Sequence, residues 1–119
     1  MERDTKVLIV EGKTDREKVR ELLDEPVEII CTHGTISFDK LEELIESIEH
    51  RDIYILVDED DAGHKLRKTL KRELPNARHL YTQSIYKEVS ETPYMYLAKI
   101  LMNANFEINR GYLLNGGTT

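Results

Sequence analysis

The sequence predicts an α/β fold, a three-layer α/β/α sandwich around a mainly parallel sheet of about four strands. Short runs of β-branched and apolar residues alternate along the chain with segments whose apolar residues recur at helical spacing. This alternation is typical of a parallel sheet covered by helices on both faces. The 119 residues fit one domain, 1–119, without an internal linker or repeat.

The first half of the chain contains two strand–helix units. A strand is expected over Lys6–Val10, after which Thr14 is expected to cap a helix and Glu17 to complete a capping box. A second strand is expected over residues 27–32. The helix after it is amphipathic, with apolar residues spaced 3, 3, 1 and 3 apart. These residues are Phe38, Leu41, Leu44, Ile45 and Ile48.

The second half repeats the alternation. Residues 53–57 are apolar throughout, as expected of a strand covered on both faces. Gly63 precedes leucines four residues apart, which indicate a helix with its basic residues largely in solvent. A weaker strand is expected over 77–81. Thr92 is expected to cap a last helix at about 93–104, with the following proline at its first position.

Composition excludes several classes of protein. Apolar runs are far shorter than the roughly 20 residues that span a bilayer. The start of the chain lacks the basic and apolar regions of a secretion signal. The single cysteine, Cys31, excludes an internal disulfide and a CxxC zinc site. We therefore expect a cytoplasmic globular protein with no membrane contact and a frayed tail at 115–119.

Charge is unevenly distributed. The net charge of −6 argues against a protein that merely coats nucleic acid. Five of the 17 basic residues nevertheless fall within eight positions, directly after an acidic run. The basic residues are Lys65, Arg67, Lys68, Lys71 and Arg72, and the acidic run is Asp58, Glu59, Asp60 and Asp61.

Three acidic residues follow predicted strands. Glu11 follows the first strand, and Asp58 and Asp60 follow the third. Ligand sites of open α/β sheets form beyond the carboxyl ends of the strands, so the three carboxylates converge if these strands are neighbours. Carboxylates so close raise one another's pKa unless a cation neutralises them, and oxygen ligands without cysteine favour Mg²⁺ or Mn²⁺. The alternative is that such residues are solvated or cap a helix, which we favour for Asp61.

Three familiar motifs fit less well. Gly12-Lys13-Thr14 resembles the end of a P-loop, but Val7 stands where that loop needs its first glycine. The D-x-D with Gly63 resembles the start of an EF-hand, but Thr69 replaces the bidentate glutamate. Response regulators match in part, because they need an acidic pair after the first strand.

Three segments together resemble the signatures of the Toprim domain, which is shared by topoisomerases, bacterial primases, OLD-type nucleases, recombination-repair proteins and the ribonuclease that matures 5S ribosomal RNA. They are residues 7–15 (VLIVEGKTD), 32–34 (THG) and 55–63 (ILVDEDDAG). The Toprim-like core covers about residues 5–82. The EGKTD run and the basic helix after D-x-D are most similar to the 5S maturation ribonuclease.

The resemblance implies a Rossmann-like Toprim fold and a role for each site residue. It implies that Glu11 is the general acid/base and touches metal, that Asp58 and Asp60 bind Mg²⁺ or Mn²⁺, and that glycines shape the site. These glycines are Gly12, Gly34 and Gly63. Residues predicted to contact nucleic acid are Lys13, Lys65, Lys68 and Arg72, with solvent exposure alone as the alternative.

Asp15 is interpreted as supporting either the metal site or the helix N-terminus. His33 either binds phosphate or has no role beyond the loop. Cys31 is expected to be a small core residue.

The function expected from these residues is Mg²⁺-dependent phosphotransfer on nucleic acid, in the manner of a small nuclease, with RNA and DNA both open. One alternative is a Toprim module that binds metal and nucleic acid, or belongs to a larger complex, without turnover. Another is a small-molecule phosphohydrolase or phosphotransfer receiver. Because Toprim enzymes carry further domains that select the substrate, a protein partner is a possible source of specificity.

Overall fold

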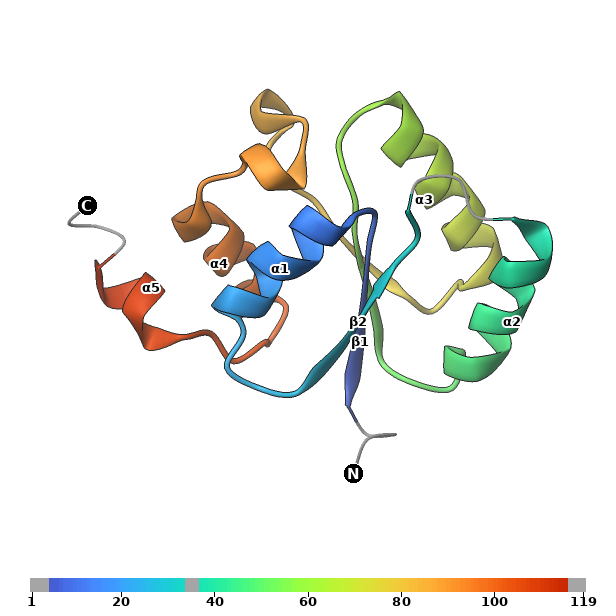
Figure 1. Ribbon diagram of the computed structural model, residues 1–119, viewed down its shortest axis with the longest axis horizontal. Coiled ribbons are helices and arrows are strands. Elements are labelled where there is room, and N and C mark those ends of the chain that lie inside the picture. Colours follow the sequence, from blue (N-terminus) through green and yellow to red (C-terminus); the bar gives the residue numbers. More distant parts are fainter. Residues whose placement is uncertain (1–4, 34–36, 116–119) are drawn as a thin grey trace.

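The computed structural model describes residues 5–33 and 37–115 and has the predicted three-layer α/β/α architecture (Figure 1). Its four strands form one sheet in the order β2-β1-β3-β4, and every neighbouring pair is parallel. The strands are β1 (Lys6–Val10), β2 (Val27–Cys31), β3 (Ile53–Leu56) and β4 (Arg78–Leu80). Strands β2, β3 and β4 each end one residue before the predicted range, and β4 also begins one residue later than predicted.

Helices cover both faces of this sheet. Helices α1 (Lys13–Leu22) and α4 (Tyr94–Asn103) pack on one face, and α2 (Phe38–Ile48) and α3 (Asp61–Glu73) pack on the other (Figure 1). A further short helix, α5 (Arg110–Asn115), was not predicted, because six residues are too few to show a helical period.

Alternate residues of the central strands supply the two halves of the core. Leu8 of β1 and Leu56 of β3 are fully buried with Leu97 of α4 on one face. Ile9 and Ile55, the next positions along these strands, are buried on the opposite face. Successive side chains of a strand point to opposite faces, so a strand between two helical layers must be apolar at every position.

Two predicted helix caps are wrong. Helix α1 begins at Lys13 with Gly12 as its N-cap, so Thr14 lies inside the helix. The Asp15 carboxylate closes this turn by accepting a hydrogen bond from the Gly12 N–H (3.2 Å). The N-cap of α4 is Pro93 rather than Thr92, whose hydroxyl instead donates to the Glu88 carbonyl (3.1 Å). At both helix starts the predicted threonine is therefore not the residue that caps the helix.

Two 3-10 turns connect β4 to α4, and neither was predicted. They are η2 (Ser84–Tyr86) and η3 (Val89–Glu91), and they lie at the end of the sheet where α1 and α3 begin (Figure 1). None of the helices within the described residues has the length and apolar character to cross a membrane. The predicted turn at Gly34 and residues 116–119 of the predicted frayed tail fall outside the described residues, whereas Asn115, the first residue of that predicted tail, ends α5.

Candidate metal centre

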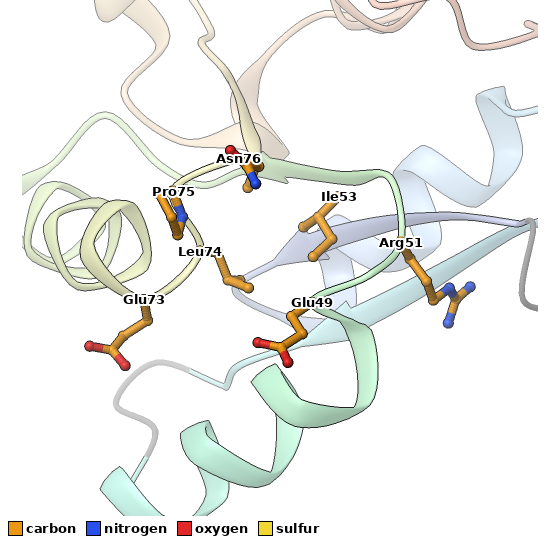
Figure 2. Close-up of a pocket in the computed structure, with 8 residues that line it drawn as sticks. Glu49, Arg51, Ile53, Glu73, Leu74, Pro75 and Asn76 are labelled. Atoms are coloured by element: carbon orange, nitrogen blue, oxygen red, sulfur yellow. The ribbon is translucent and has the colours of Figure 1, made fainter.

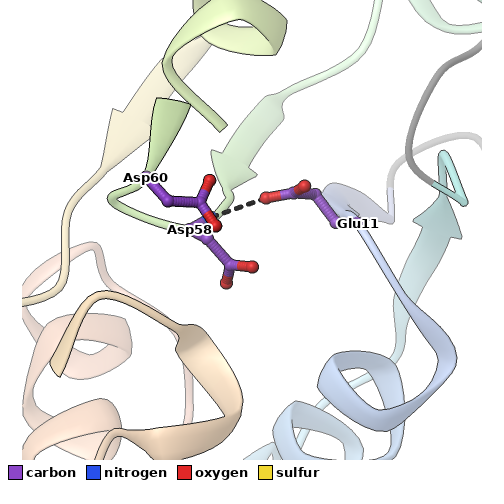
Figure 3. A group of neighbouring side chains, drawn as sticks. All are labelled: Glu11, Asp58 and Asp60. Atoms are coloured by element: carbon purple, nitrogen blue, oxygen red, sulfur yellow. Dashed lines mark hydrogen bonds between the residues drawn. The ribbon is translucent and has the colours of Figure 1, made fainter. Parts of the chain in front are cut away.

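The three acidic residues singled out by the sequence meet at the carboxyl edge of the sheet. Strands β1 and β3 are parallel neighbours, so the residues that follow them lie side by side. One carboxylate oxygen from each of Glu11, Asp58 and Asp60 lies within 4.8 Å of the others (Figure 3). All three side chains are partly buried. The arrangement offers converging oxygen ligands to one ion.

Backbone N–H groups fix the three carboxylates in place. Glu11 Oε1 accepts from the Asp58 N–H (2.7 Å), drawn as the dashed line in Figure 3. Asp58 Oδ1 accepts from the Val89 N–H in turn η3 (2.8 Å). Asp60 is the N-cap of α3, and its Oδ1 accepts from the Gly63 N–H (2.8 Å). Each side chain is therefore oriented through one oxygen, and its second oxygen accepts no hydrogen bond from the described residues.

Burial and mutual repulsion make the cluster hold protons more tightly than isolated acids. Burial raises the pKa of Asp58 to about 6, with repulsion from Glu11, Asp15 and Asp60 adding to the effect, while the hydrogen bond from the Val89 N–H opposes it. Burial likewise raises the pKa of Glu11, and repulsion from Asp60 and Asp15 reinforces that direction. A bound cation would lower the pKa values of these carboxylates again, because it favours their ionised form.

Gly63 allows the D-x-D turn to close on α3. It is buried in the first turn of that helix, and a Cβ atom there would lie 2.0 Å from the Asp58 carbonyl oxygen. The sequence placed Gly63 in a turn before the helix, whereas the helix begins at Asp61. At Gly12, by contrast, an added Cβ would make an ordinary contact of 3.7 Å with Asp15. Close backbone approach therefore requires glycine at Gly63 and not at Gly12.

The family comparison agrees with this geometry. A model of the family described as Toprim domain matches residues 6–91, which include the whole carboxylate cluster. The chain belongs to the Toprim domain family. It is 50% identical over 108 residues to a Bacillus subtilis protein named "Uncharacterized protein YusF", covering 91% of this chain and 74% of that protein.

Other relatives point to the same family. A solved structure described as a small TOPRIM domain protein from Bacillus stearothermophilus superposes with a TM-score of 0.89 at 47% identity, over 93% of this chain and 94% of that one. Ribonuclease M5 of Fusobacterium nucleatum is 33% identical over 79 residues. That match covers 66% of this chain but only 43% of the ribonuclease, so this Toprim chain corresponds to less than half of the enzyme's length.

One residue of the basic segment supports the Toprim site from within the protein. We expected the basic residues of α3 largely in solvent, but Arg67 is only 4% exposed. Its Nη2 donates to the carbonyls of Val57 (3.2 Å) and Leu80 (2.7 Å) and to Glu59 Oε2 (2.9 Å). Helical spacing places Arg67 on the same side as the buried leucines, so its charge must be paired there. Arg67 therefore connects the ends of β3 and β4 to the turn that contains Asp58 and Asp60.

The environment of Arg67 also keeps His79 neutral. The Arg67 Nη1 lies 3.1 Å from His79 Nδ1. Burial and the neighbouring positive charges, that of Arg67 first, lower the pKa of His79 to about 4. The guanidinium also lies over the Tyr81 ring, 4.1 Å from its centroid.

The four predicted nucleic-acid contacts are exposed but do not form one group at the Toprim carboxylates. Lys13 is the first residue of α1, directly after the strand that ends at Glu11. Lys65 and Lys68 lie on the exposed side of α3. Arg72 lies twelve residues after Asp60, about 18 Å along the helix axis at 1.5 Å per residue, where its Nε donates to Glu73 (3.2 Å). Of these four residues, Lys13 and Lys65 follow Glu11 and Asp60 most closely along the chain.

Sequence reasoning missed residues 84–91, the segment with turns η2 and η3, which forms one wall of the site. Besides the Val89 contact, the Lys87 carbonyl accepts from the Glu59 N–H (2.5 Å). Lys18 of α1 reaches across and donates to the Ser90 carbonyl (2.8 Å). The buried Val89, an apolar residue in a polar stretch, is the one sequence signal of this packing.

Three further predictions concern residues close to the end of β1. Asp15 is 7% exposed and closes the start of α1, which is the helix role we anticipated, and its charge also acts on Glu11 and Asp58. His33 is exposed, and its backbone N–H donates to the Glu11 carbonyl (2.6 Å). Cys31 is half-buried, and its thiol donates to the Gly12 carbonyl (3.4 Å).

Figure 2 shows the residues that line a hollow of about 190 Å³. They include Ile53, the first residue of β3, so this hollow lies at the end of the sheet opposite the carboxylates. It is formed where α2 and α3 end and β3 begins, by Glu49, Glu73, Ile53 and their neighbours. This hollow lies at the amino edge of the strands, whereas sites of parallel sheets form at the carboxyl edge.

Proposed function

We propose that the protein cleaves phosphodiester bonds of nucleic acid with the help of Mg²⁺ or Mn²⁺. The observation that carries the proposal is the convergence of Glu11, Asp58 and Asp60 at the carboxyl edge of a Toprim sheet. Carboxylate oxygens alone form the donor set, which suits a hard divalent cation better than zinc. Asp58 and Asp60 would hold the ion, with Glu11 beside them.

The ion, when bound, would stabilise negative charge on the reacting phosphate and help to orient it. The chain itself supplies proton transfer. Glu11 is held through Oε1 by the Asp58 N–H, which leaves Oε2 to accept or donate a proton. Its raised pKa lies closer to neutral pH than that of an ordinary glutamate, as general acid/base catalysis requires.

Nucleic acid is the proposed substrate because exposed lysines begin or lie early in the helices that follow the carboxylates. Lys13 at the start of α1 and Lys65 on α3 would contact phosphates on either side of the reacting one. With a net charge of −6, binding depends on these local contacts and on the ion rather than on the whole surface. RNA is the first substrate to test, since relatives that match this chain are named ribonuclease M5.

The second candidate is metal-dependent binding without turnover. It is favoured by the partial match to the ribonucleases, in which this chain corresponds to 43% of the Fusobacterium enzyme. A partner protein would then select the substrate or complete the reaction. The two candidates share the metal site and differ only in whether a bond is broken.

Cleavage assays on matched variants separate these possibilities. Structured RNA, single-stranded DNA and a simple phosphate monoester are incubated with the protein and Mg²⁺ or Mn²⁺. We expect cleavage of a polynucleotide that is lost in Glu11→Gln and Asp58→Asn, and no reaction with the monoester. Asp61→Asn is the control, because Asp61 is exposed and outside the cluster. Metal-dependent binding without cleavage would select the second candidate, and undiminished cleavage in both cluster variants would refute the first.

A further inference from the structure

A hollow beside the carboxylates has features that the metal centre does not use. Its volume is about 570 Å³, within the range of small-molecule sites. Asp60 belongs both to its lining and to the metal centre. The rest of the lining comes from the segment after β4, namely Ile85, Tyr86, Lys87, Glu88 and Glu91.

Ile85 is unusual for an apolar side chain in this protein. It lies in turn η2 and is 79% exposed, whereas the isoleucines of the described strands and helices are buried or partly buried. The ring of the neighbouring Tyr86 packs against that of Tyr96 of α4, with ring centroids 5.9 Å apart. The hollow therefore presents an apolar surface that no described residue of the chain covers.

The segment that carries Ile85 is firmly connected to the metal centre. Lys87 has φ 45°, a left-handed conformation that is unfavourable for a residue other than glycine. This conformation aims the Lys87 carbonyl at the Glu59 N–H, while the Val89 N–H holds Asp58. A ligand in the hollow would consequently sit at a fixed distance from an ion held by Asp58 and Asp60.

Charge in the hollow selects against phosphate and in favour of hydrogen-bond donors. Its lining has three carboxylates, from Asp60, Glu88 and Glu91, and one cation, Lys87. Within residues 5–33 and 37–115, the carboxylates of Glu88 and Glu91 accept no hydrogen bond and form no ion pair within 4 Å. Carboxylates accept hydrogen bonds from the exocyclic amino groups of bases, and they repel a carbonyl or phosphate oxygen.

We propose that this hollow binds an unpaired base bearing an amino group, next to the phosphate that the metal centre holds. Ile85 and Tyr86 contact the faces of the base, and Glu88 or Glu91 accepts from its amino group. A base within a duplex cannot enter, because its faces are stacked on the neighbouring base pairs and are not free to contact Ile85 and Tyr86. The inference rests on the proposed function and adds to it a substrate class: single-stranded or looped nucleic acid, with cytosine preferred over uracil.

Oligocytidylate and oligouridylate of equal length test the inference, because their bases differ in an amino group against a carbonyl. Binding is measured by fluorescence anisotropy with Mg²⁺ in the Glu11→Gln background, so that the probe stays intact. We expect oligocytidylate to bind roughly fivefold or more tightly than oligouridylate, as one good base contact provides. Annealing oligocytidylate to its complement is expected to remove most of its affinity.

Variants of the hollow identify the residues responsible. Glu88→Gln/Glu91→Gln is expected to bring the two probes to equal affinity, since an amide both donates and accepts. Ile85→Ser is expected to weaken oligocytidylate roughly threefold to tenfold through lost apolar contact. Matched controls are Glu42→Gln/Glu43→Gln on exposed α2 positions and Met102→Ser, another exposed apolar residue. Both controls should retain the preference.

The outcomes separate the inference from the function on which it rests. Equal binding of the two probes, equal binding of the duplex, or a preference that survives in the hollow variants overturns the inference. If binding in these cases still disappears in Asp58→Asn/Asp60→Asn, the proposed function stands. Binding of neither probe, or binding that ignores the Asp58 and Asp60 changes, overturns both.

Discussion

Asp58→Asn should make the metal-free protein more stable. Burial and the neighbouring carboxylates raise the pKa of Asp58 to about 6 from a usual 3.8. The shift of about two units corresponds to about 3 kcal/mol for a fully shielded group. Because Asp58 is partly open to water, we expect about 1 kcal/mol. Asparagine keeps an oxygen for the Val89 N–H and removes only the charge.

The effect should depend on pH in a definite direction. A folded-state pKa above the unfolded value means that the folded protein holds the proton more tightly. The resulting stabilisation of the wild type is fully present below about pH 4 and is lost as pH rises through about 6. The asparagine variant has no such loss. The difference in unfolding free energy between the asparagine variant and the wild type should therefore be largest above about pH 7 and fall by about half near pH 5.

Thermal unfolding followed by circular dichroism, with EDTA present, measures this difference. An advantage of about 1 kcal/mol corresponds to a rise in Tm of about 4 °C for a chain of this length. Saturating Mg²⁺ should reverse the order, because an ion that binds only the folded wild type stabilises it. A variant that is equal to or less stable than the wild type above about pH 7 in EDTA would refute the reasoning.

Other consequences concern the residues around the cluster. Gly63→Ala should cost about 3 kcal/mol or more, measured by urea unfolding, because its Cβ would lie 2.0 Å from the Asp58 carbonyl; a change below about 1 kcal/mol would contradict this. Arg67→Met should cost about 3 kcal/mol in the same assay, since it leaves Glu59 and two carbonyls without their donor, and a neutral outcome would mean that these contacts are not needed. Mg²⁺ affinity, measured by calorimetry, should weaken as pH falls through about 6, where protons compete for Asp58, and a flat profile from about pH 8 to 5 would exclude Asp58 as a ligand. Lys65→Ala should weaken binding of a short oligonucleotide and reduce its salt dependence by about one unit of slope, whereas an unchanged slope would remove Lys65 from the interface.

The sequence was sufficient for the features that follow from periodicity and topology. Fully apolar strands such as Ile53–Leu56 signal a sheet covered on both faces, and parallel strands bring their carboxyl ends to one edge. The convergence of Glu11 with Asp58 and Asp60 could therefore be predicted, as could the amphipathic α2.

What could not be predicted depends on contacts between distant segments. Arg67 shares a helix face with Leu70 and Leu74, but the sequence does not show that Glu59 and the Leu80 carbonyl lie close enough to pair its charge there. The wall formed by residues 84–91 depends on backbone hydrogen bonds, such as that from the Val89 N–H to Asp58, which leave no residue pattern. Thr14 and Thr92 carried ordinary cap signals, but Asp15 accepts from the Gly12 N–H at the start of α1, and the Thr92 hydroxyl donates to the Glu88 carbonyl instead.

The central claim is that the three carboxylates hold a divalent ion at which a phosphodiester bond is processed. Calorimetric titration of Mn²⁺ and Mg²⁺ tests it most directly, with a short oligonucleotide present and with wild type compared to Asp58→Asn/Asp60→Asn. We predict saturable binding by the wild type that disappears in the double variant, while the variant remains folded by circular dichroism. Equal binding by both proteins, or binding by neither, would contradict the claim and reduce the cluster to a helix cap and its acidic neighbours.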